Sequence, residues 1–504
     1  MPRLRRVVEQ HGALQYSDAM AHGLSKSKLM SFRQCPKKLW LEKHRPDLGE
    51  VTAETQAIFD MGHEVGAIAQ QLYDTGGGVL IEYDDGLRDA VERTNEVLRK
   101  QPSVPIFEAT FVRNGLLIRA DVLERGAGGP RLIEVKSSTR VKDEHVADCA
   151  IQSWVLDTST ARPTAVVLAH IDNQFVYPGD GKYRGLLTEA DLTAQVAPLR
   201  GEVADWVREA KRVLAGGEPK AEIGRRCTQP YDCQFQDYCW KKTEFPLRGL
   251  PNINSRLDEL LAAGYQDVRE VPEAMLKGAE QLRVWRAVRS GEVSLSPAAR
   301  DEFAALAYPR YYLDFETVGS AVPRWAGMRP YQPVPFQFSL HVESAPGQLQ
   351  HAEYLDLTGE LPARAVAMAL LGAVGTNGPV FMYTNYEKQC LEALAKFCPD
   401  LRERLEALMG RLVDLHPIAR RHYYHPAMQG SWSIKNLLPA IAPELDYSHL
   451  GEIREGNAAG RAYLEAIAPQ TTAERRAAIR ESLIAYCKHD TLAMVTVARF
   501  LEGR

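Results

Sequence analysis

Two acidic clusters and one set of cysteines have residue types and spacings that could do chemistry. The first acidic cluster joins Asp121 to the run Leu132-Ile133-Glu134-Val135-Lys136. Side chains alternate along a strand, so Glu134 and Lys136 are expected to share one face of a sheet. The carboxylates of Asp121 and Glu134, with the backbone carbonyl of Val135, are hard oxygen ligands of the kind that Mg²⁺ or Mn²⁺ prefers. Lys136 is suited to orient an attacking water and to stabilise charge on a phosphate.

Four cysteines bracket this acidic cluster. Cys35 lies near the start of the chain, and Cys227, Cys233 and Cys239 follow with five residues between successive thiols. Loops of this length fold back easily, so the three late thiols can reach one inorganic centre, with Cys35 as the fourth ligand. Thiolates favour zinc or iron–sulfur chemistry. The remaining cysteines have no such neighbours and are expected to be core or surface thiols: Cys149, Cys390, Cys398 and Cys487.

The second acidic cluster is spread over the last third of the chain. Asp314 and Glu316 alternate on one predicted strand, and Glu387 follows another. Tyr486 and Asp490 are four residues apart, which places the hydroxyl and the carboxylate on one helix face. Such a set suits two divalent metals that act on an in-line displacement at phosphorus. Tyr486 would position the attacking water.

Two α/β modules are expected to position these clusters. The first module should contain helices over 24–45, 55–73, 86–100 and 143–157 and strands over 76–82, 106–111, 115–123, 131–135 and 165–170. The second should contain strands near 311–313, 334–342 and 379–383 and helices over 361–374, 387–396, 474–488 and 490–501. The predicted domains are 1–245, a helical connector over 246–305, and 306–504.

Size and composition set wide limits on the class of protein. The chain has 504 residues, enough for two or three domains, and 45% of them are hydrophobic and 25% charged. No stretch is long and apolar enough to span a bilayer, and the amino terminus lacks the apolar segment of a secretory signal. We therefore expect a cytoplasmic protein with reduced thiols and no membrane partner. The net charge of −4 gives no general attraction to nucleic acid, but carboxylates can offset a local basic groove.

The first module resembles the PD-(D/E)XK nuclease superfamily in its RecB-like branch. Asp121, Glu134 and Lys136 match the active-site pattern, His63 in Gly62-His63-Glu64 matches an upstream helical histidine, and Gln152 matches a glutamine on the following helix. The resemblance implies that His63 is a further metal ligand and that Gln152 supports the site. It implies a PD-(D/E)XK restriction-endonuclease-like fold.

With the four cysteines, the resemblance narrows to CRISPR-associated RecB-like exonucleases and the AddB nuclease domain. In those proteins one early and three late cysteines hold a [4Fe–4S] cluster, which implies this role for Cys35, Cys227, Cys233 and Cys239. Family members commonly place two of the late cysteines only two residues apart, whereas both gaps here are five residues. Zinc therefore stays open as the alternative.

The second module resembles the DEDD 3′–5′ exonucleases of the ribonuclease H-like fold, in the subgroup with a tyrosine in the last motif. Asp314, Glu316, Tyr486 and Asp490 match that pattern. The second motif normally ends in aspartate, and Glu387 stands in that place. Asp414, in Leu412-Val413-Asp414-Leu415, is a rival for this third carboxylate.

The combination resembles a bacterial family that joins a RecB-like iron–sulfur nuclease to a carboxy-terminal DEDD-type domain. It implies a metal-dependent nuclease that acts on DNA, with single-stranded ends favoured, and a second module that trims 3′ ends. One alternative is an RNA-processing 3′–5′ exonuclease in which only the second module turns over. Another is a nucleic-acid-binding scaffold with both sites inert. The sequence does not indicate a protein partner.

Overall fold

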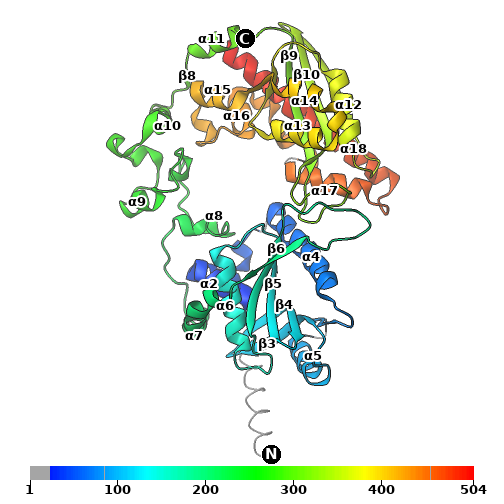
Figure 1. Cartoon of the computed structure of the whole chain (residues 1–504). Helices are drawn as coiled ribbons and strands as arrows, with labels where there is room; N and C mark the ends of the chain where they lie inside the picture. Colours follow the sequence, from blue (N-terminus) through cyan, green and yellow to red (C-terminus); the bar gives the residue numbers. More distant parts are fainter. Residues whose placement is uncertain (1–22, 51, 85, 454–455) are drawn as a thin grey trace, which may run out of the picture. The chain divides into compact units, whose positions relative to one another are not determined.

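The computed structural model describes residues 23–50, 52–84, 86–453 and 456–504 (Figure 1). It divides into two compact units. Unit 1 comprises Met1–Lys241 and Ala321–Pro330, and unit 2 comprises Lys242–Ser320 and Tyr331–Arg504. Each unit has its own sheet, so the chain is a mixed α/β protein. The amino-terminal segment, on which the expectation about a secretory signal rested, lies outside the described residues.

No helix in the described part of the chain has the length and apolarity needed to cross a membrane. The segment over 246–305, expected to be a connector, packs within unit 2.

Unit 1 is built on a mixed sheet in which the described strands follow the order β2-β3-β4-β5-β6-β7, with β1 pairing beside β4. The strands expected near 106–111, 115–123, 131–135 and 165–170 appear as β3 to β6, and β7 was not foreseen. Leu116, Ile118 and Ala120 alternate into the core, which leaves Asp121 on the other side of β4. The strands of unit 1 are β1 (Leu24–Ser25), β2 (Val79–Leu80), β3 (Ile106–Arg113), β4 (Leu116–Gly126), β5 (Gly129–Lys136), β6 (Ala165–Ile171) and β7 (Leu187–Asp191).

The helices of unit 1 cover this sheet and carry several of the predicted site residues. Buried residues of α6 and α7 join the same core as β3 and β4. The described helices are α2 (Lys26–Gln34), α3 (Pro36–His44), η1 (Pro46–Leu48), α4 (Ala53–Tyr73), α5 (Leu87–Lys100), α6 (Asp143–Leu156), α7 (Thr193–Ala215), η2 (Arg225–Cys227) and α8 (Gln236–Cys239).

The prediction of a single helix over 24–45 is wrong, because the helical segment is interrupted at Cys35 and forms two helices, α2 and α3. Pro36 begins α3, where its missing N–H costs nothing, and its ring disfavours a helical conformation at the preceding residue. Cys35 is accordingly extended, with φ of −161°. The break sets the Cys35 thiol at a corner between two helices.

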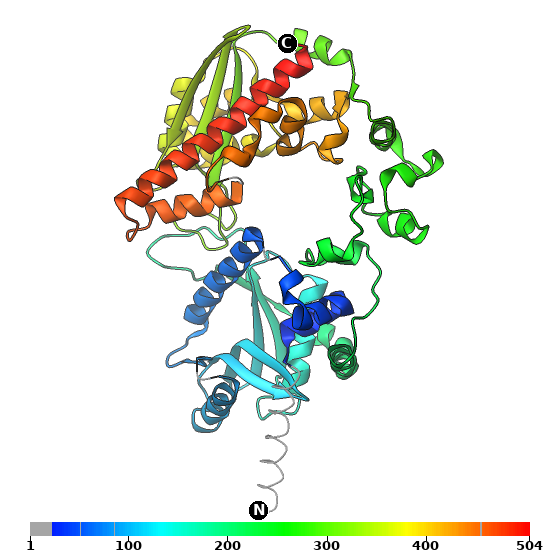
Figure 2. The ribbon, with the colours of Figure 1, turned by 180° about the vertical axis from the view of Figure 1, so that it is seen from behind.

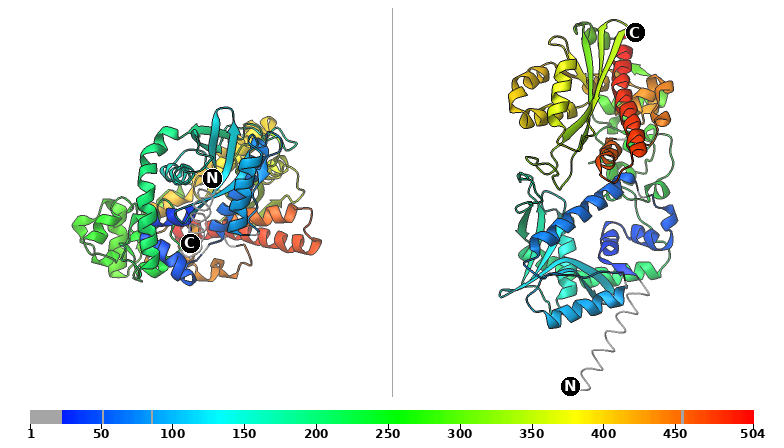
Figure 3. Two further views of the ribbon diagram at one scale, coloured as in Figure 1. Left: turned by 90° about the horizontal axis from the view of Figure 1, so that it is seen from below. Right: turned by 90° about the vertical axis from the view of Figure 1, so that its right-hand side faces the viewer.

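Unit 2 has three layers around a mixed sheet whose described strands follow the order β11-β10-β9-β12-β13. β10 runs antiparallel to β9, whereas β12 runs parallel to β9 and to β13. The helices α17 and α18 pack on one face, and α12 and α13 pack on the other (Figure 3, right). The acidic residues of β9 therefore lie between the sheet and α18.

The two helices expected over 474–488 and 490–501 are one helix, α18 (Figure 2). The hydroxyl of Thr472 caps its start, and Gly503 ends it with φ of 85°. No proline or glycine interrupts Ala473–Glu502, so the sequence contains no residue that would break the helix. This continuity fixes Tyr486 and Asp490 on one rigid rod.

The remaining elements of unit 2 complete the list. Its strands are β8 (Ser294–Leu295), β9 (Arg310–Val318), β10 (Val334–Ala345), β11 (Gln348–Leu355), β12 (Val380–Met382), β13 (Leu412–Asp414) and β14 (Tyr423–Tyr424). Its α-helices are α9 (Leu257–Ala262), α10 (Gly278–Ser290), α11 (Ala298–Ala304), α12 (Ala363–Ala373), α13 (Tyr386–Phe397), α14 (Arg402–Met409), α15 (Leu415–His422), α16 (Ile434–Ile441), α17 (Gly456–Ile467) and α18 (Ala473–Glu502). Its 3-10 turns are η3 (Leu247–Gly249), η4 (Val268–Glu270), η5 (Glu273–Met275), η6 (Pro399–Leu401), η7 (Pro426–Met428), η8 (Pro443–Leu445) and η9 (Tyr447–His449).

Candidate active sites

The first acidic site lies where β4, β5 and α6 meet in unit 1. Glu134 is buried, and its Oε1 lies 2.6 Å from the Nζ of Lys136. The side-chain amide of Gln152 donates a hydrogen bond to the other oxygen of Glu134. Asp121 accepts a 2.7 Å hydrogen bond from the backbone N–H of Val135. These residues come together as expected, although the contact from Val135 is made by its N–H.

Two residues that were not foreseen complete this network. The Nζ of Lys26, at the first position of α2, lies 2.8 Å from Glu134 Oε1 and 3.1 Å from Asp148 Oδ1. Lys136 also reaches Asp148, at 2.7 Å. Asp148 could have been found, because it precedes Gln152 by four residues and so shares its face of α6. Lys26 could not, because its approach depends on how α2 packs.

The charges of this network shift the pKa values of its two aspartates in opposite directions. Burial, with the neighbouring carboxylate of Glu134, raises the pKa of Asp121 to about 8. Burial opposes ionisation of Asp148 as well, but Lys136 and Lys26 outweigh it and hold the pKa of Asp148 below its usual range. The positive charge near Asp121 is therefore too small to keep its carboxylate ionised at neutral pH. A bound cation would supply the missing positive charge.

His63 is exposed on α4. Among the described residues, no hydrogen bond or ion pair joins it to Asp121 or Glu134. His63 lies near Glu108. Burial raises the pKa of Glu108 above its usual value, and the positive charges of Arg119, Lys26 and His63 offset part of this rise.

Glu108 is a further carboxylate beside Asp121. The registers Phe107↔Val122 and Val122↔Ile133 align Glu108, Asp121 and Glu134 across β3, β4 and β5. Glu108 has φ of 55°, a left-handed conformation that is costly for a non-glycine residue. The sequence gives no sign of this kink.

The four predicted cysteine ligands line one pocket in unit 1. The N–H of Cys233 donates to the carbonyl of Cys227 at 2.8 Å, which folds the late run back on itself. Burial raises the pKa of the Cys239 thiol to about 11, with Cys233, Cys227 and Cys35 raising it and the ammonium of Lys37 opposing them. The thiols therefore lie close enough to act on one another.

The spacing of these sulfurs is wide for a single metal ion. In the described part of the chain, no three of them lie within 4.8 Å of one another. Four sulfurs at about 2.3 Å from one tetrahedral zinc lie only about 3.8 Å apart.

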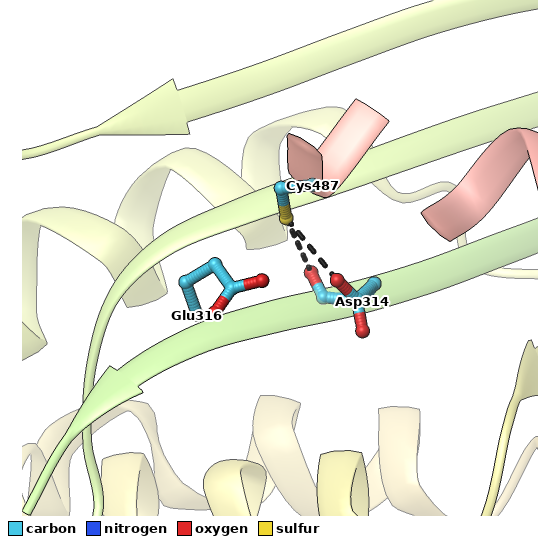
Figure 4. A group of neighbouring side chains, drawn as sticks. All are labelled: Asp314, Glu316 and Cys487. Atoms are coloured by element: carbon cyan, nitrogen blue, oxygen red, sulfur yellow. Dashed lines mark hydrogen bonds between the residues drawn. The ribbon is translucent and has the colours of Figure 1, made fainter. Parts of the chain in front are cut away.

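The second acidic site lies between β9, α13 and α18 in unit 2. Asp314 and Glu316 project from β9 toward α18, where the Sγ of Cys487 lies 3.3 Å from Asp314 Oδ2 (Figure 4). One ligand atom from each of these three residues falls within 4.8 Å of the others, close enough to hold one metal ion. Cys487 was expected to be an isolated thiol. Its position directly after Tyr486 in the sequence does not predict a contact with Asp314.

Glu387 and Asp490 complete the acidic set. Burial and the charge of Asp490 raise the pKa of Asp314 far above its usual range. Burial and the charges of Asp314 and Asp490 do the same for Glu316. Burial and Asp314 likewise raise the pKa of Glu387, and its Oε2 is buried without a hydrogen-bond partner among the described residues. Carboxylates crowded in this way call for cations.

Asp414, the rival for the third carboxylate, has a different role. It accepts 2.9 Å hydrogen bonds from the backbone N–H groups of Thr384 and His416 and caps α15. The charge of Asp414 helps to raise the pKa of Glu387. Of these two carboxylates, Glu387 is the one that bonds to Asp314 and so belongs to the acidic set.

Two tyrosines and a lysine surround Asp490. The hydroxyl of Tyr447 donates to Asp490 Oδ1 at 2.5 Å, and Tyr486 also bonds to Asp490. The Nζ of Lys435 lies 5.3 Å from the centre of the Tyr486 ring and 5.4 Å from that of Tyr447. Tyr486 was predicted. Tyr447 and Lys435 were missed, because they reach the site from a 3-10 turn and from the first turn of α16, and only tertiary packing brings these elements to α18.

Comparison with protein families matches residues 311–433 to a domain of unknown function (DUF2779). This region contains Asp314, Glu316 and Glu387 but not Asp490. No curated protein matches the chain. A solved structure titled "Crystal structure of SSO0001" covers 45% of this chain and 95% of its own, with 13% identity and a TM-score of 0.23. That likeness carries no argument about fold or function.

Proposed function

We propose that this chain is a divalent-metal-dependent nuclease that hydrolyses phosphodiester bonds of DNA, with single-stranded ends favoured. Under this proposal unit 1 has the PD-(D/E)XK restriction-endonuclease-like fold, and unit 2 has the ribonuclease H-like fold of DEDD 3′–5′ exonucleases. The observation that carries the proposal is the buried set of Asp314, Glu316, Glu387 and Asp490, in which each carboxylate resists ionisation and one buried oxygen lacks a partner.

The residues of unit 2 fit a pair of Mg²⁺ or Mn²⁺ ions. Asp314, Glu316 and Asp490 would hold them, and Glu387 would complete the set. Bound ions would polarise the phosphoryl oxygens and lower the pKa of a water molecule. Tyr486 bonds to Asp490 and is held where its hydroxyl would orient that water. Tyr447 fixes the carboxylate of Asp490 from the other side.

The acidic residues of unit 1 fit the same metal-dependent hydrolysis, but different neighbouring residues surround the metal ligands. Asp121 and Glu134 would hold the metal, and beside them lies the Oε1 of Gln152, which has no hydrogen-bond partner in the described part of the chain. Lys136 would stabilise charge on the phosphate. Glu108 is a better candidate for the additional metal ligand than His63, because it aligns with Asp121 and Glu134.

The cysteine pocket fits a [4Fe–4S] cluster held by Cys35, Cys227, Cys233 and Cys239. All four cysteines line this one pocket, as four thiolate ligands of one inorganic group require. Lys37, Lys38 and Arg226 also line the pocket and would balance the negative charge of four thiolates. The group would have a structural role, because it would link the corner between α2 and α3 to α8, which ends at Cys239.

Degradation of end-labelled single-stranded DNA and RNA with Mg²⁺ or Mn²⁺ tests the proposal. Lys136→Ala should remove cleavage by unit 1, and Asp490→Ala should slow shortening from the 3′ end by at least about 100-fold. Asp400→Ala is the matched control, since Asp400 is exposed and forms a surface ion pair with Arg364. Absence of metal-dependent degradation of every substrate would overturn the proposal and leave a binding scaffold.

A further inference from the structure

Unit 2 contains a pocket of about 500 Å³ that the catalytic proposal does not use. This volume lies in the range of small-molecule sites. One wall is the segment from Gly430 to Lys435, and a second is formed by Tyr383 and Thr384, directly after β12. His416 and Arg420 on α15 and the Pro251-Asn252 step close it.

The Pro251-Asn252 wall is held in place by a close backbone approach. Gly430 has φ of 78°, and a side chain there would collide with the carbonyl of Gly249. The carbonyl of Pro251 accepts a 2.7 Å hydrogen bond from Gln281 on α10. The segment expected to be a connector thus builds one side of the pocket.

Lys435 connects this pocket to the acidic site. It lines the pocket, and its Nζ lies 5.4 Å from the centre of the ring of Tyr447, whose hydroxyl bonds to Asp490 at 2.5 Å. The pocket therefore opens one side chain away from the carboxylates.

The chemistry of the pocket matches a nucleotide. Arg420 uses two of its five N–H donors to bind Glu280, at 2.9 and 2.6 Å, so the remaining donors can meet a phosphate. The rings of Tyr383 and His416 lie edge to face at 5.6 Å, and Trp432 forms a buried wall bonded to Tyr423. None of the described residues that line the pocket carries a carboxylate.

We infer that this pocket is the subsite for the nucleotide next to the scissile phosphate of a single-stranded polynucleotide. Arg420 and Lys435 take its phosphate, and Tyr383 and His416 contact its base. This inference rests on the proposed function of the acidic site, because the position of the scissile phosphate comes from there.

Photo-crosslinking tests the inference. A short single strand with 5-iodouracil near its 3′ end is irradiated with the full chain in a Lys136→Ala/Asp490→Asn background, in which neither proposed site turns over. Mass spectrometry should find the crosslink on a peptide that contains Tyr383, His416 or Trp432. Arg420→Gln and Ser433→Trp, which fills the rim at an exposed residue, should each reduce its yield by about tenfold.

Arg421→Gln is the matched control, since the neighbouring guanidinium bonds to Glu302 outside the pocket. Crosslinks that map elsewhere, or yields that Arg420→Gln and Ser433→Trp leave unchanged, would overturn the inference. The proposed function fails separately, when the unmodified chain degrades no strand. A pocket crosslink without any degradation would support the subsite as a binding site and reject the nuclease.

Discussion

Lys26 places a buried ammonium between two carboxylates of unit 1, Glu134 and Asp148. Removing one partner from a buried ion network leaves the other charges uncompensated, at a cost of about 3–5 kcal/mol. We expect Lys26→Met to lower the free energy of unfolding of unit 1 by about 3 kcal/mol in urea titrations. Lys28→Met is the control, because Lys28 bonds the carbonyl of Gly23 at 2.8 Å. Equal unfolding curves for the two variants would contradict the network.

The site residues that the sequence predicted are those fixed by local periodicity. Glu134 with Lys136, and Asp314 with Glu316, follow from the two-residue repeat of a strand. The missed residues reach their sites through long-range packing. Tyr447, for example, is 43 residues from Asp490 in the chain and lies in a 3-10 turn. No short-range pattern links such positions, so only the tertiary structure places them.

At the scale of elements, the corner between α2 and α3 positions Cys35 toward the late cysteines. We expect anaerobically purified protein to be brown and to contain about four iron atoms per chain, and Cys35→Ser to lose both. Cys398→Ser is the control, because Cys398 is a buried thiol of unit 2. Iron and colour are measured by elemental analysis and absorbance. Colourless protein with one zinc per chain would contradict the cluster.

The existence of most helices and strands was predictable, but their ends and partners were not. Proline at position 36 was a visible signal for the break at Cys35 and should have divided the expected helix. The absence of a breaker near His489 should likewise have joined the two expected helices into α18. The pairing of β9 with β12 brings together strands over 60 residues apart, and no local feature encodes it.

His341 on β10 makes the attachment of α18 depend on pH. Its Nδ1 lies 2.8 Å from the hydroxyl of Thr491 on α18. Burial, with the charges of His351, Lys488 and Arg499, lowers the pKa of His341 to about 4 from 6.5. The unfolded chain therefore takes up a proton between these values while the folded chain does not, so stability is complete above pH 6.5 and falls toward pH 4.

The contribution of His341 to the stability of wild type should fall by about 2 kcal/mol between pH 7 and pH 5, measured by urea unfolding at both pH values. His341→Gln should abolish most of this pH dependence. His449→Gln should retain it, because the side chain of His449 is 85% exposed. A His341→Gln variant whose stability changes between pH 7 and pH 5 as much as that of wild type would refute the assignment.

At the scale of the whole molecule, the two units have separate cores built from different segments of the chain. Domains with their own cores unfold in separate cooperative steps. We expect calorimetry to show two transitions, with Cys35→Ser lowering only one. Glu343→Gln should lower only the other, because Glu343 is fully buried in unit 2 and its carboxylate bonds to Arg499 at 2.8 Å and to Arg504. Loss of that charge removes the carboxylate partner of Arg499, whereas Arg504 keeps Glu502, and we expect a cost of about 1–3 kcal/mol. A single transition that both variants shift alike would show that the units fold as one.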